Sequence, residues 1–367
     1  MNHEVRVGII GMGLIGAMLH LPSLKSHPKA RVTAICSRTR ERVEGIAKTH
    51  QIPQVFTDYR EMIDQGNLEA IVVATPDDLH YTMTMDALDA GLHVFCEKPL
   101  ATTVTQAKEM TNKAEAIGVI NMVSFSNRWR PHYRHLKTLV DQGYIGRPYH
   151  VHFRFLAGYG REPRYGWRFD RQRANGVLGD LASHMIDLAR WYIGDIVKVS
   201  AHLGTFVERP GPNGGDLDPA NDSAMLLLEF ENGAQGTIHV SAVAHTADRG
   251  QEQHVLLHGA AGTLEASTSM KGTDWSKMIM RTPHELRGVR QDHAQFEDIP
   301  IPEHLWENAD PENALSVFST QPVGVRLFID AIVEDKPVVP SFYDGLKAQE
   351  VIEAANRSHE EGRWITL

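Results

Sequence analysis

The chain has 367 residues, and its 37 Lys+Arg against 46 Asp+Glu give a formal net charge of −9 at pH 7. That length predicts two domains, and the negative charge argues against a nucleic-acid-binding protein, because phosphate backbones are bound by basic surfaces. Only two cysteines are present, Cys36 and Cys96, so a disulfide framework is excluded and a reducing compartment such as the cytoplasm is expected.

The sequence also lacks the signals of secretion and of membrane insertion. No basic segment follows Met1, and the longest apolar stretch, residues 7–19, is shorter than the about 20 residues that a membrane-spanning helix needs. We therefore expect a protein that neither spans nor binds a membrane.

Short β-branched segments alternate with helical segments in the first third of the chain. We predict strands at residues 5–10, 31–36, 70–74, 93–96 and 121–125. We predict a helix that ends near residue 25 and further helices at 40–50, 78–90 and 103–117. This alternation predicts a parallel sheet with right-handed crossovers, and an α/β domain over residues 1–125.

After residue 125 the strands become longer and few helices separate them. We predict strands at residues 149–155, 197–203, 224–230, 234–240 and 254–258, with a hairpin turn at Asn232-Gly233. We predict one helix at 177–192, loops at 209–220 and 268–300, and a return to helix from residue 320, most regular at 345–358. The pattern indicates an antiparallel or mixed sheet in a second, α+β domain over residues 126–367, whose C-terminal helix is a candidate to pack back on the first domain.

The turn after the first strand fits the pattern G-x-G-x-x-G. It reads Gly11-Met12-Gly13-Leu14-Ile15-Gly16 and opens a helix. In a dinucleotide site the first glycine permits a tight turn, the second lets the pyrophosphate approach the backbone, and the third lets the helix pack on the strand. Free N–H groups at the helix start then face the phosphates. The alternative is a glycine-rich turn that serves packing alone.

The end of the second strand bears on which dinucleotide is bound. An NAD site usually carries Asp or Glu there to hold the ribose hydroxyls, but this strand ends in Cys36-Ser37-Arg38 with no acid. Arg38 can stack on adenine and pair with a 2′-phosphate, and Ser37 can donate a hydrogen bond to the same group. This favours NADP over NAD, unless Arg38 and Arg40 are only the solvated start of a helix.

Lys98 follows the strand at residues 93–96, within Glu97-Lys98-Pro99. Ligands of open parallel sheets bind beyond the carboxyl ends of the strands, so this lysine is a candidate for the reaction centre. The alternative is an ordinary surface charge.

Asp180 and His184 form a second candidate centre. They are four residues apart in a predicted helix, which places them on one face, and an imidazole has a pKa suited to removing a proton from an alcohol near neutral pH. The alternatives are a surface ion pair and a metal-binding pair, but no third ligand at a telling spacing accompanies them. The other histidines, such as His150/His152 and His132/His135, are joined by no Cys or carboxylate cluster, so we predict surface or interface roles for most and no metal site.

These elements together resemble the family of glucose–fructose oxidoreductases, inositol dehydrogenases and rhizopine-catabolism (MocA-type) oxidoreductases. The resemblance covers nearly the whole chain, and the Glu-Lys-Pro element together with the Asp-x-x-x-His element carries most of it. Further matching positions are the glycine turn 11–16, His20, Ala74-Thr75-Pro76 with His80, Arg128, Ser341 to Gly345, and Gly362-Arg363-Trp364.

The resemblance implies a Rossmann domain followed by a domain built on a large, open, mostly antiparallel sheet that mediates homodimers or homotetramers. It implies hydride transfer between NAD(P) and a secondary alcohol of a sugar, sugar acid or cyclitol. His184 would take the hydroxyl proton, Lys98 would stabilise the alkoxide, and Asp180 would orient the substrate or the imidazole. The residues that would line the cofactor outside the glycine turn are Ser37, Arg38, Ala74, Thr75, Pro76, His80, Glu97, Lys98, Trp167 and Arg168.

The substrate-binding residues are less well defined by the sequence. Tyr159, Arg161, Arg164 and Tyr165 lie in a loop before the Asp-His helix, where they could bind hydroxyls or a carboxylate, or pack on a neighbouring subunit; His245 is a further candidate. Two other functions stay open within the same fold: a glycosidase that uses tightly held NAD as a transient oxidant, and a dinucleotide-sensing regulator without catalysis. Retention of Lys98, Asp180 and His184 together argues against the regulator.

Overall fold

The computed structural model describes residues 3–270, 284–311, 313 and 315–367, and the chain divides into two compact units. Unit 1 comprises Met1–Phe125 and Leu315–Gln349, and unit 2 comprises Ser126–Ala314 and Glu350–Leu367. Among the described residues, no helix combines the length and the apolar character needed to cross a membrane.

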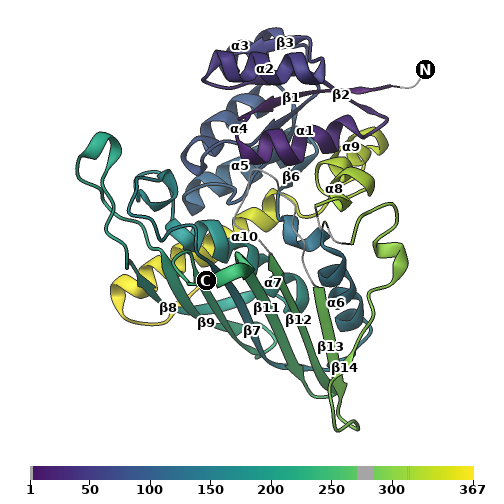
Figure 1. Ribbon diagram of the computed structural model, residues 1–367, viewed down its shortest axis with the longest axis vertical. Helices are drawn as coiled ribbons and strands as arrows, with labels where there is room; N and C mark the ends of the chain where they lie inside the picture. Colours follow the sequence, from purple (N-terminus) through teal and green to yellow (C-terminus); the bar gives the residue numbers. More distant parts are fainter. Residues whose placement is uncertain (1–2, 271–283, 312, 314) are drawn as a thin grey trace. The chain divides into compact units, whose positions relative to one another are not determined.

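Unit 1 is built on a parallel sheet whose strands have the order β3-β2-β1-β4-β5-β6 (Figure 1). The order reverses between β1 and β4, as in a Rossmann fold. The strands are β1 (Val5–Ile10), β2 (Ala30–Cys36), β3 (Gln54–Phe56), β4 (Ala70–Val73), β5 (His93–Cys96) and β6 (Asn121–Val123). β1 and β4 are buried along nearly their whole length, which explains why valine and isoleucine make up most of both strands.

Helices connect these strands, and local sequence sets where they begin and end. They are a π-helical turn at Gly16–His20 continued by α1 (Leu21–Lys25), then α2 (Arg40–His50), α3 (Tyr59–Gln65), α4 (His80–Asp89) and α5 (Val104–Ile117). In α5, the Thr103 side chain accepts a hydrogen bond from Gln106 N, and Gly118 ends the helix with φ +70°. The sequence analysis missed the short elements β3 and α3.

Three helical segments from late in the chain also belong to unit 1. They are α8 (Val317–Thr320), α9 (Val325–Glu334) and the first turns of α10 (Phe342–Glu361). Gln349 Nε2 donates to Thr102 O over 3.0 Å, and a Cβ on Gly345 would lie only 2.8 Å from Leu100 Cβ. The start of α10 therefore packs against the segment that follows β5.

Unit 2 is built on a large mixed sheet of order β14-β13-β12-β11-β7-β10-β9-β8-β15 (Figure 1). Among the strand pairs described in this second sheet, only β10–β7 is parallel, so the predicted, mostly antiparallel sheet is confirmed. The strands are β7 (Pro148–Ala157), β8 (Ile196–Gly204), β9 (Ser223–Phe230), β10 (Gln235–Ser241), β11 (Gln251–Gly259), β12 (Gly262–Met270), β13 (His284–Arg290), β14 (Glu297–Asp298) and β15 (Ile365–Thr366).

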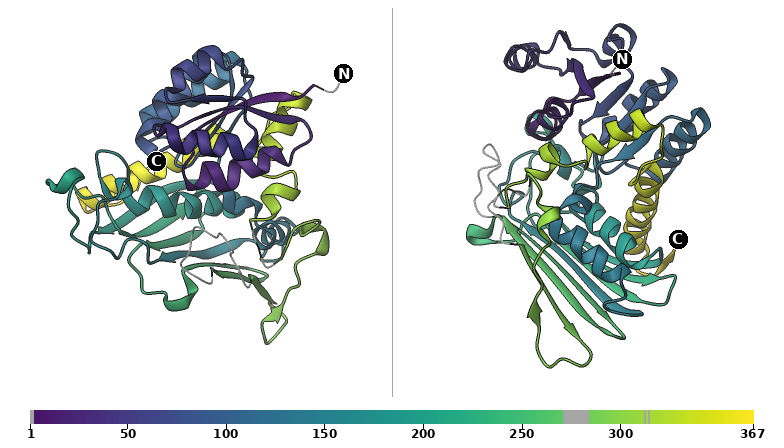
Figure 2. Two further views of the ribbon diagram at one scale, coloured as in Figure 1. Left: turned by 45° about the horizontal axis from the view of Figure 1, so that its top comes forward. Right: turned by 90° about the vertical axis from the view of Figure 1, so that its right-hand side faces the viewer.

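Helices cover one face of this sheet. α7 (Ser183–Ile193) packs against β7, and α6 (Pro131–Asp141) packs against β12 and β13; both lie on the same side of the sheet in Figure 2. The inner positions of β7, Val151, Phe153 and Phe155, are buried, whereas the alternate positions face the other side. The predicted hairpin at Asn232-Gly233 is confirmed, because it joins the antiparallel pair β9–β10.

Two expectations about this unit are wrong. The sequence analysis missed helix α6, and it expected a loop over residues 268–300, where β12 ends at Met270 and β13 spans His284–Arg290. In β13, Leu286 and Gly288 are buried and alternate with the exposed Glu285 and Arg287, so a single large apolar residue left the pattern too weak to recognise. Residues 271–283 lie outside the described part of the chain.

Candidate functional site

Two of the glycines in the turn after β1 are required by the packing of the backbone itself. Gly11 has φ +95°, and a Cβ there would lie 2.3 Å from the carbonyl oxygen of Ala74. A Cβ on Gly16 would lie 2.0 Å from the carbonyl oxygen of Gly11. The first and third glycines of the pattern therefore let the chain turn tightly and let the helix approach the strand.

Gly13 differs from these two glycines. A Cβ there would meet no atom within 4 Å, and the residue is exposed, so the packing of the protein does not explain a glycine at this position. The apolar side chains of Leu14 and Met18 nearby are 37% and 36% exposed. The turn thus leaves room for a group outside the protein at the start of a helix, which is the geometry that a dinucleotide pyrophosphate needs.

Three of the predicted segments meet at one edge of the unit 1 sheet. Gly11–Gly16 follows β1, residues 74–76 follow β4, and Glu97 and Lys98 follow β5, and these three strands are neighbours. Ala74 N donates to Ile10 O over 2.8 Å, and Glu97 N donates to Val73 O over 2.9 Å. The glycine turn and Lys98 therefore belong to the same edge, at the carboxyl ends of the strands.

The buried side chain of His80 links the segment after β4 to the segment after β5 by hydrogen bonds. Its ring is fully buried, with Nδ1 2.8 Å from Pro99 O and Nε2 2.9 Å from Thr75 O. Burial lowers the pKa of this imidazole, but the nearby Cys96 sulfur and the two carbonyl oxygens outweigh burial and raise the pKa to about 9. A protonated ring donates one hydrogen bond to each carbonyl oxygen. Because His80 is buried, its role at the candidate site is to hold the segments that contain Thr75 and Pro99 in place.

Glu97 is held in a similar way by a residue of the first helix. Its Oε1 lies 2.7 Å from His20 Nε2, its Oε2 accepts from Lys98 N over 3.2 Å, and both side chains are largely buried. Burial raises the pKa of the Glu97 carboxyl, but the hydrogen bond and charge of His20, with help from Lys98 and Ser124, lower the pKa to about 2. The carboxylate is therefore ionised and fixes the backbone that carries Lys98.

The end of β2 is followed by an exposed arginine, Arg38, close to the buried Cys36. Arg38 is exposed and Ser37 is half-buried, with Ser37 N donating to Phe56 O over 3.2 Å. Burial raises the pKa of the Cys36 thiol to about 12, and the negative charges of Asp58 and Glu61 add to the effect. Two carboxylates thus lie close to the strand end where the sequence itself has no acid.

In unit 2, the helix that carries Asp180 and His184 begins with a π-helical turn at Leu178–Ala182 and continues as α7. Asp180 lies in this π-helical turn and His184 in the first turn of α7, whereas the predicted i,i+4 spacing assumed one continuous α-helix. A π-helical turn also opens the first helix of unit 1, at Gly16–His20. Such turns are rare and frequently occur at functional sites.

The start of this helix is fixed by Asn221, a residue that is distant in sequence but in direct contact with it. Asn221 Oδ1 accepts from Leu178 N over 3.0 Å, and Asn221 Nδ2 donates to Asn175 O over 2.9 Å. Gly176 has φ +62°, and a Cβ there would lie 2.2 Å from Asn221 O. Gly176 therefore permits the contact that anchors the helix. No motif in the sequence indicates the role of Asn221.

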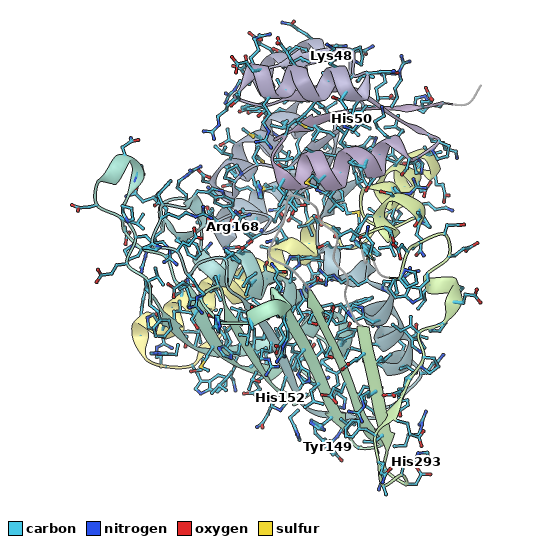
Figure 3. The ribbon with its side chains drawn as sticks, viewed as in Figure 1. Lys48, His50, Tyr149, His152, Arg168 and His293 are labelled. Atoms are coloured by element: carbon cyan, nitrogen blue, oxygen red, sulfur yellow. The ribbon has the colours of Figure 1, made fainter. Side chains whose placement is uncertain are left out.

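Asp180 has two partners from the preceding loop. The Tyr159 hydroxyl donates to Asp180 Oδ2 over 2.5 Å, and Arg168 Nε lies 3.2 Å from the same oxygen. Arg168 also lies over the Trp167 ring, with 4.3 Å between the guanidinium carbon and the ring centroid. The loop from β7 to α7, in which Figure 3 labels Arg168, is thus organised around the Asp180 carboxylate.

His184 stands in the first turn of α7 and is 9% exposed. One turn further on, Asp187 accepts two hydrogen bonds from the Arg128 guanidinium, at 2.9 Å from Nε and 2.5 Å from Nη2. Both partners of this ion pair are buried, and the Arg128 guanidinium carbon lies 5.6 Å from the Trp191 ring centroid. The pair fixes α7 beneath His184, and it gives Arg128 a structural role.

A second buried ion pair organises the loop over residues 209–220. Arg209 Nη1 lies 3.1 Å from Asp222 Oδ2, and both side chains are almost fully buried. Asp222 also accepts from Phe206 N and Val207 N, and the Arg209 guanidinium lies 3.9 Å from the Phe169 ring centroid. Most of the segment is an exposed loop, as predicted. The prediction is wrong for Arg209, whose buried side chain pairs with Asp222, 13 positions later.

The other residues predicted to bind substrate are paired with nearby acidic residues or exposed. Tyr165 donates to Asp170 over 3.1 Å, Arg164 pairs with Glu162 on the surface, and Arg161 and His245 are exposed. Trp167, Arg168, Asp180 and His184 all belong to unit 2, whereas the other predicted cofactor residues and Lys98 belong to unit 1.

Comparison with known proteins agrees with this division. Residues 5–125 match a family described as an oxidoreductase family with an NAD-binding Rossmann fold, and residues 133–265 match the GFO/IDH/MocA C-terminal domain. Levoglucosan dehydrogenase of Pseudarthrobacter phenanthrenivorans is 28% identical, over 99% of this chain and 98% of that protein. A scyllo-inositol 2-dehydrogenase (NADP(+)) of Bacillus subtilis is 25% identical, over 99% of this chain and 96% of that protein.

A solved structure shares the whole architecture. Levoglucosan dehydrogenase in complex with NADH and levoglucosan has a TM-score of 0.86 and 27% sequence identity, covering 100% of this chain and 99% of that chain. The family matches cover well over half of the chain and include the glycine turn, Lys98, Asp180 and His184. The chain therefore belongs to the Gfo/Idh/MocA family of oxidoreductases.

Proposed function

We propose that this protein transfers hydride between a nicotinamide dinucleotide and a secondary alcohol of a sugar, sugar acid or cyclitol. The relatives named for levoglucosan and scyllo-inositol act on compounds of this class. The main support is the edge of the unit 1 sheet, where the open glycine turn follows β1 and Lys98 follows β5, with only β4 between these two strands. Ligands of this fold bind at that edge.

A bound nicotinamide would accept the hydride from the alcohol carbon. His184 then takes the hydroxyl proton as general base, a role that suits an imidazole near neutral pH. Lys98 donates a hydrogen bond to the same oxygen and stabilises the negative charge that develops on it. In the reductive direction the same two groups polarise the carbonyl and return the proton.

Asp180 has a positioning role in this proposal. Its carboxylate is already bound by the Tyr159 hydroxyl and Arg168, so it is fixed in place before substrate arrives. A fixed carboxylate can orient a sugar hydroxyl or the imidazole, which lowers the entropic cost of reaching a reactive geometry.

For the cofactor we propose a preference for NADP over NAD. Arg38 is exposed at the end of β2, where a guanidinium can pair with a 2′-phosphate in bidentate fashion, and Ser37 is beside it. The charges of Asp58 and Glu61 near Cys36 oppose this preference, because they would repel an added phosphate. Titration of the chain with NADPH and with NADH side by side tests this preference.

We also propose that the part of the outer face of the unit 2 sheet around β9 joins subunits into a homodimer or homotetramer. On β9, Met225 and Leu227 are 53% and 50% exposed, whereas the alternate positions are buried. Exposed large apolar residues on a sheet face indicate a protein contact. Sedimentation of the purified chain tests this; a monomer at micromolar concentration would contradict it.

The direct test of the function is NAD(P)H formation on a panel of sugars, sugar acids and inositols, followed by absorbance. We expect His184→Ala and Lys98→Ala each to lower kcat/KM strongly, with the dissociation constant of the dinucleotide near the wild-type value. The double variant should lose far less than the product of the two single losses, because both groups act on one oxygen. His202→Ala, on an exposed residue of β8, is the control.

Two outcomes would replace this proposal by another function of the same fold. Cleavage of glycosides by protein that retains its nucleotide, without net NADH, would indicate the glycosidase. Dinucleotide binding with no turnover of any compound, and with no effect of His184→Ala, would indicate the regulator.

A further inference from the structure

Three histidines gather on the face of the unit 2 sheet that α7 does not cover. His150 and His152 alternate with buried residues on β7, and His258 stands on the neighbouring strand β11, directly opposite His150. The ring centroids are 4.6 Å apart for His150 and His258, and 5.8 Å apart for His150 and His152. One ring nitrogen from each of the three residues lies within 4.8 Å of the other two.

The sequence analysis missed this group because His258 is more than 100 residues from the other two. Only the antiparallel register of β7 and β11 brings it beside them. Figure 3 labels His152 on the sheet, where its side chain leaves the ribbon on the side away from α6 and α7.

Threonines on the adjacent strands orient two of the rings. His152 Nδ1 lies 2.8 Å from Thr237 Oγ1 on β10, and His258 Nδ1 lies 2.9 Å from Thr263 Oγ1 on β12. When Nδ1 carries the proton and donates it to the threonine, Nε2 carries the lone pair. A hydrogen bond at one ring nitrogen is the usual device that orients a metal-ligating histidine and fixes its tautomer.

We propose that His150, His152 and His258 form a binding site for a divalent transition metal ion, with Zn²⁺ as the ion of reference. Three imidazole nitrogens suit Zn²⁺, Co²⁺, Ni²⁺ and Cu²⁺, whereas Mg²⁺ and Ca²⁺ prefer oxygen ligands. Zinc–nitrogen bonds of about 2.0–2.1 Å in a tetrahedron place the nitrogens about 3.4 Å apart, so binding draws the three ring nitrogens closer than the 4.8 Å within which they now lie. Water takes the fourth position.

The site is separate from the proposed reaction. His184 stands on α7, which packs on the inner face of β7; the Tyr192 and Phe153 rings stack there at 6.4 Å. His150, His152 and His258 face the opposite side of the same strands. The metal site therefore adds a property that hydride transfer does not require.

The test uses the full chain without a polyhistidine tag, freed of metal with a chelator. Calorimetric titration with Zn²⁺ should give one ion per chain, and Co²⁺ should give the visible absorption bands of a tetrahedral site. His258→Gln and His150→Gln should each weaken binding at least tenfold, and Thr263→Val should weaken it about tenfold through the lost orientation of His258. Because His150 is exposed, its replacement leaves the packing of the sheet unchanged.

The control is His239→Gln, because His239 lies on the same face of the sheet, on β10 opposite Arg154. It should bind Zn²⁺ as the wild-type chain does. The proposal is overturned if the wild-type chain binds no Zn²⁺, if His258→Gln and His150→Gln bind it unchanged, or if His239→Gln weakens binding to the same extent.

Discussion

The Tyr159 hydroxyl donates a 2.5 Å hydrogen bond to Oδ2 of Asp180, the carboxylate oxygen that Arg168 also approaches. A tyrosine of the loop before the helix thus fixes the aspartate that the sequence analysis placed in the reaction centre. The contact links an exposed loop to the helix that carries His184, so it gives a direct way to disturb Asp180 while retaining its charge.

Replacing Tyr159 by Phe should lower kcat/KM about tenfold. A hydrogen bond to a charged group is worth about 1.5–3 kcal/mol, and the lower end of that range corresponds to a tenfold change in rate. Steady-state kinetics with the preferred substrate measures the effect. Tyr165→Phe is the matched control, because that hydroxyl donates to Asp170 instead; equal kcat/KM for Tyr159→Phe and wild type would remove Tyr159 from this role.

Replacing Asp187 by Asn should destabilise the protein by about 3–5 kcal/mol, because it leaves the buried Arg128 guanidinium without its counter-charge. The control is Glu44→Gln. The Arg40 and Glu44 side chains are 62% and 54% exposed, so loss of this pair should cost below about 1 kcal/mol. Urea unfolding compares the two variants, and losses of equal size would show that burial does not set the strength of the Arg128–Asp187 pair.

Alanine substitutions of Gly13 and Gly16, in the turn after β1, should distinguish an effect on dinucleotide binding from an effect on folding stability. Gly13→Ala should change the free energy of unfolding by less than about 0.5 kcal/mol, since its Cβ meets nothing within 4 Å, yet weaken dinucleotide binding at least tenfold. Gly16→Ala should destabilise the fold by about 2 kcal/mol, because its Cβ would lie 2.0 Å from Gly11 O. Thermal unfolding and dinucleotide titration of both variants test this; tight binding by Gly13→Ala would place the pyrophosphate elsewhere.

Glu97 should make stability depend on pH in the acid range. Its pKa is lowered from 4.5 to about 2 in the folded protein, so the folded state binds the proton more weakly than the unfolded state does. The resulting stabilisation, at most about 3 kcal/mol, is complete above pH 4.5 and is lost as the pH falls toward 2.

Comparison of wild type with Glu97→Gln over this range provides the measurement. Wild type should be the more stable protein at pH 7, and the difference should shrink between pH 4.5 and pH 2. Glu208→Gln, on an exposed side chain, should stay parallel to wild type. A constant difference between wild type and Glu97→Gln at all pH values would contradict the His20–Glu97 pairing.

Local patterns predicted much of the fold. The regular alternation of strands and helices in residues 1–125 depends on β-branched runs and on residues such as Gly118 that end helices. The elements that were missed depend on distant partners instead. β13 has one large apolar side chain, Leu286, and forms because β12 offers a complete ladder of hydrogen bonds beside it.

The same limit applies to the site. The glycine turn, Lys98 and His184 have recognisable neighbours in sequence, and the sequence analysis singled them out. The partners of Asp180 come from residues 12 and 21 positions earlier, Arg209 finds Asp222 across a loop, and His258 reaches His150 only through strand register. Such contacts depend on the path of the chain through space, and no local spacing reveals them.

The most direct test of the central claim is the titration of tryptophan fluorescence of the folded, nucleotide-free chain with NADPH and with NADH. We expect saturable binding of both, tighter for NADPH, and a loss of that preference in Arg38→Ala. Equal weakening of both cofactors in Arg38→Ala would contradict the proposed 2′-phosphate contact. Failure of the folded wild-type chain to bind either dinucleotide would contradict the hydride-transfer function itself.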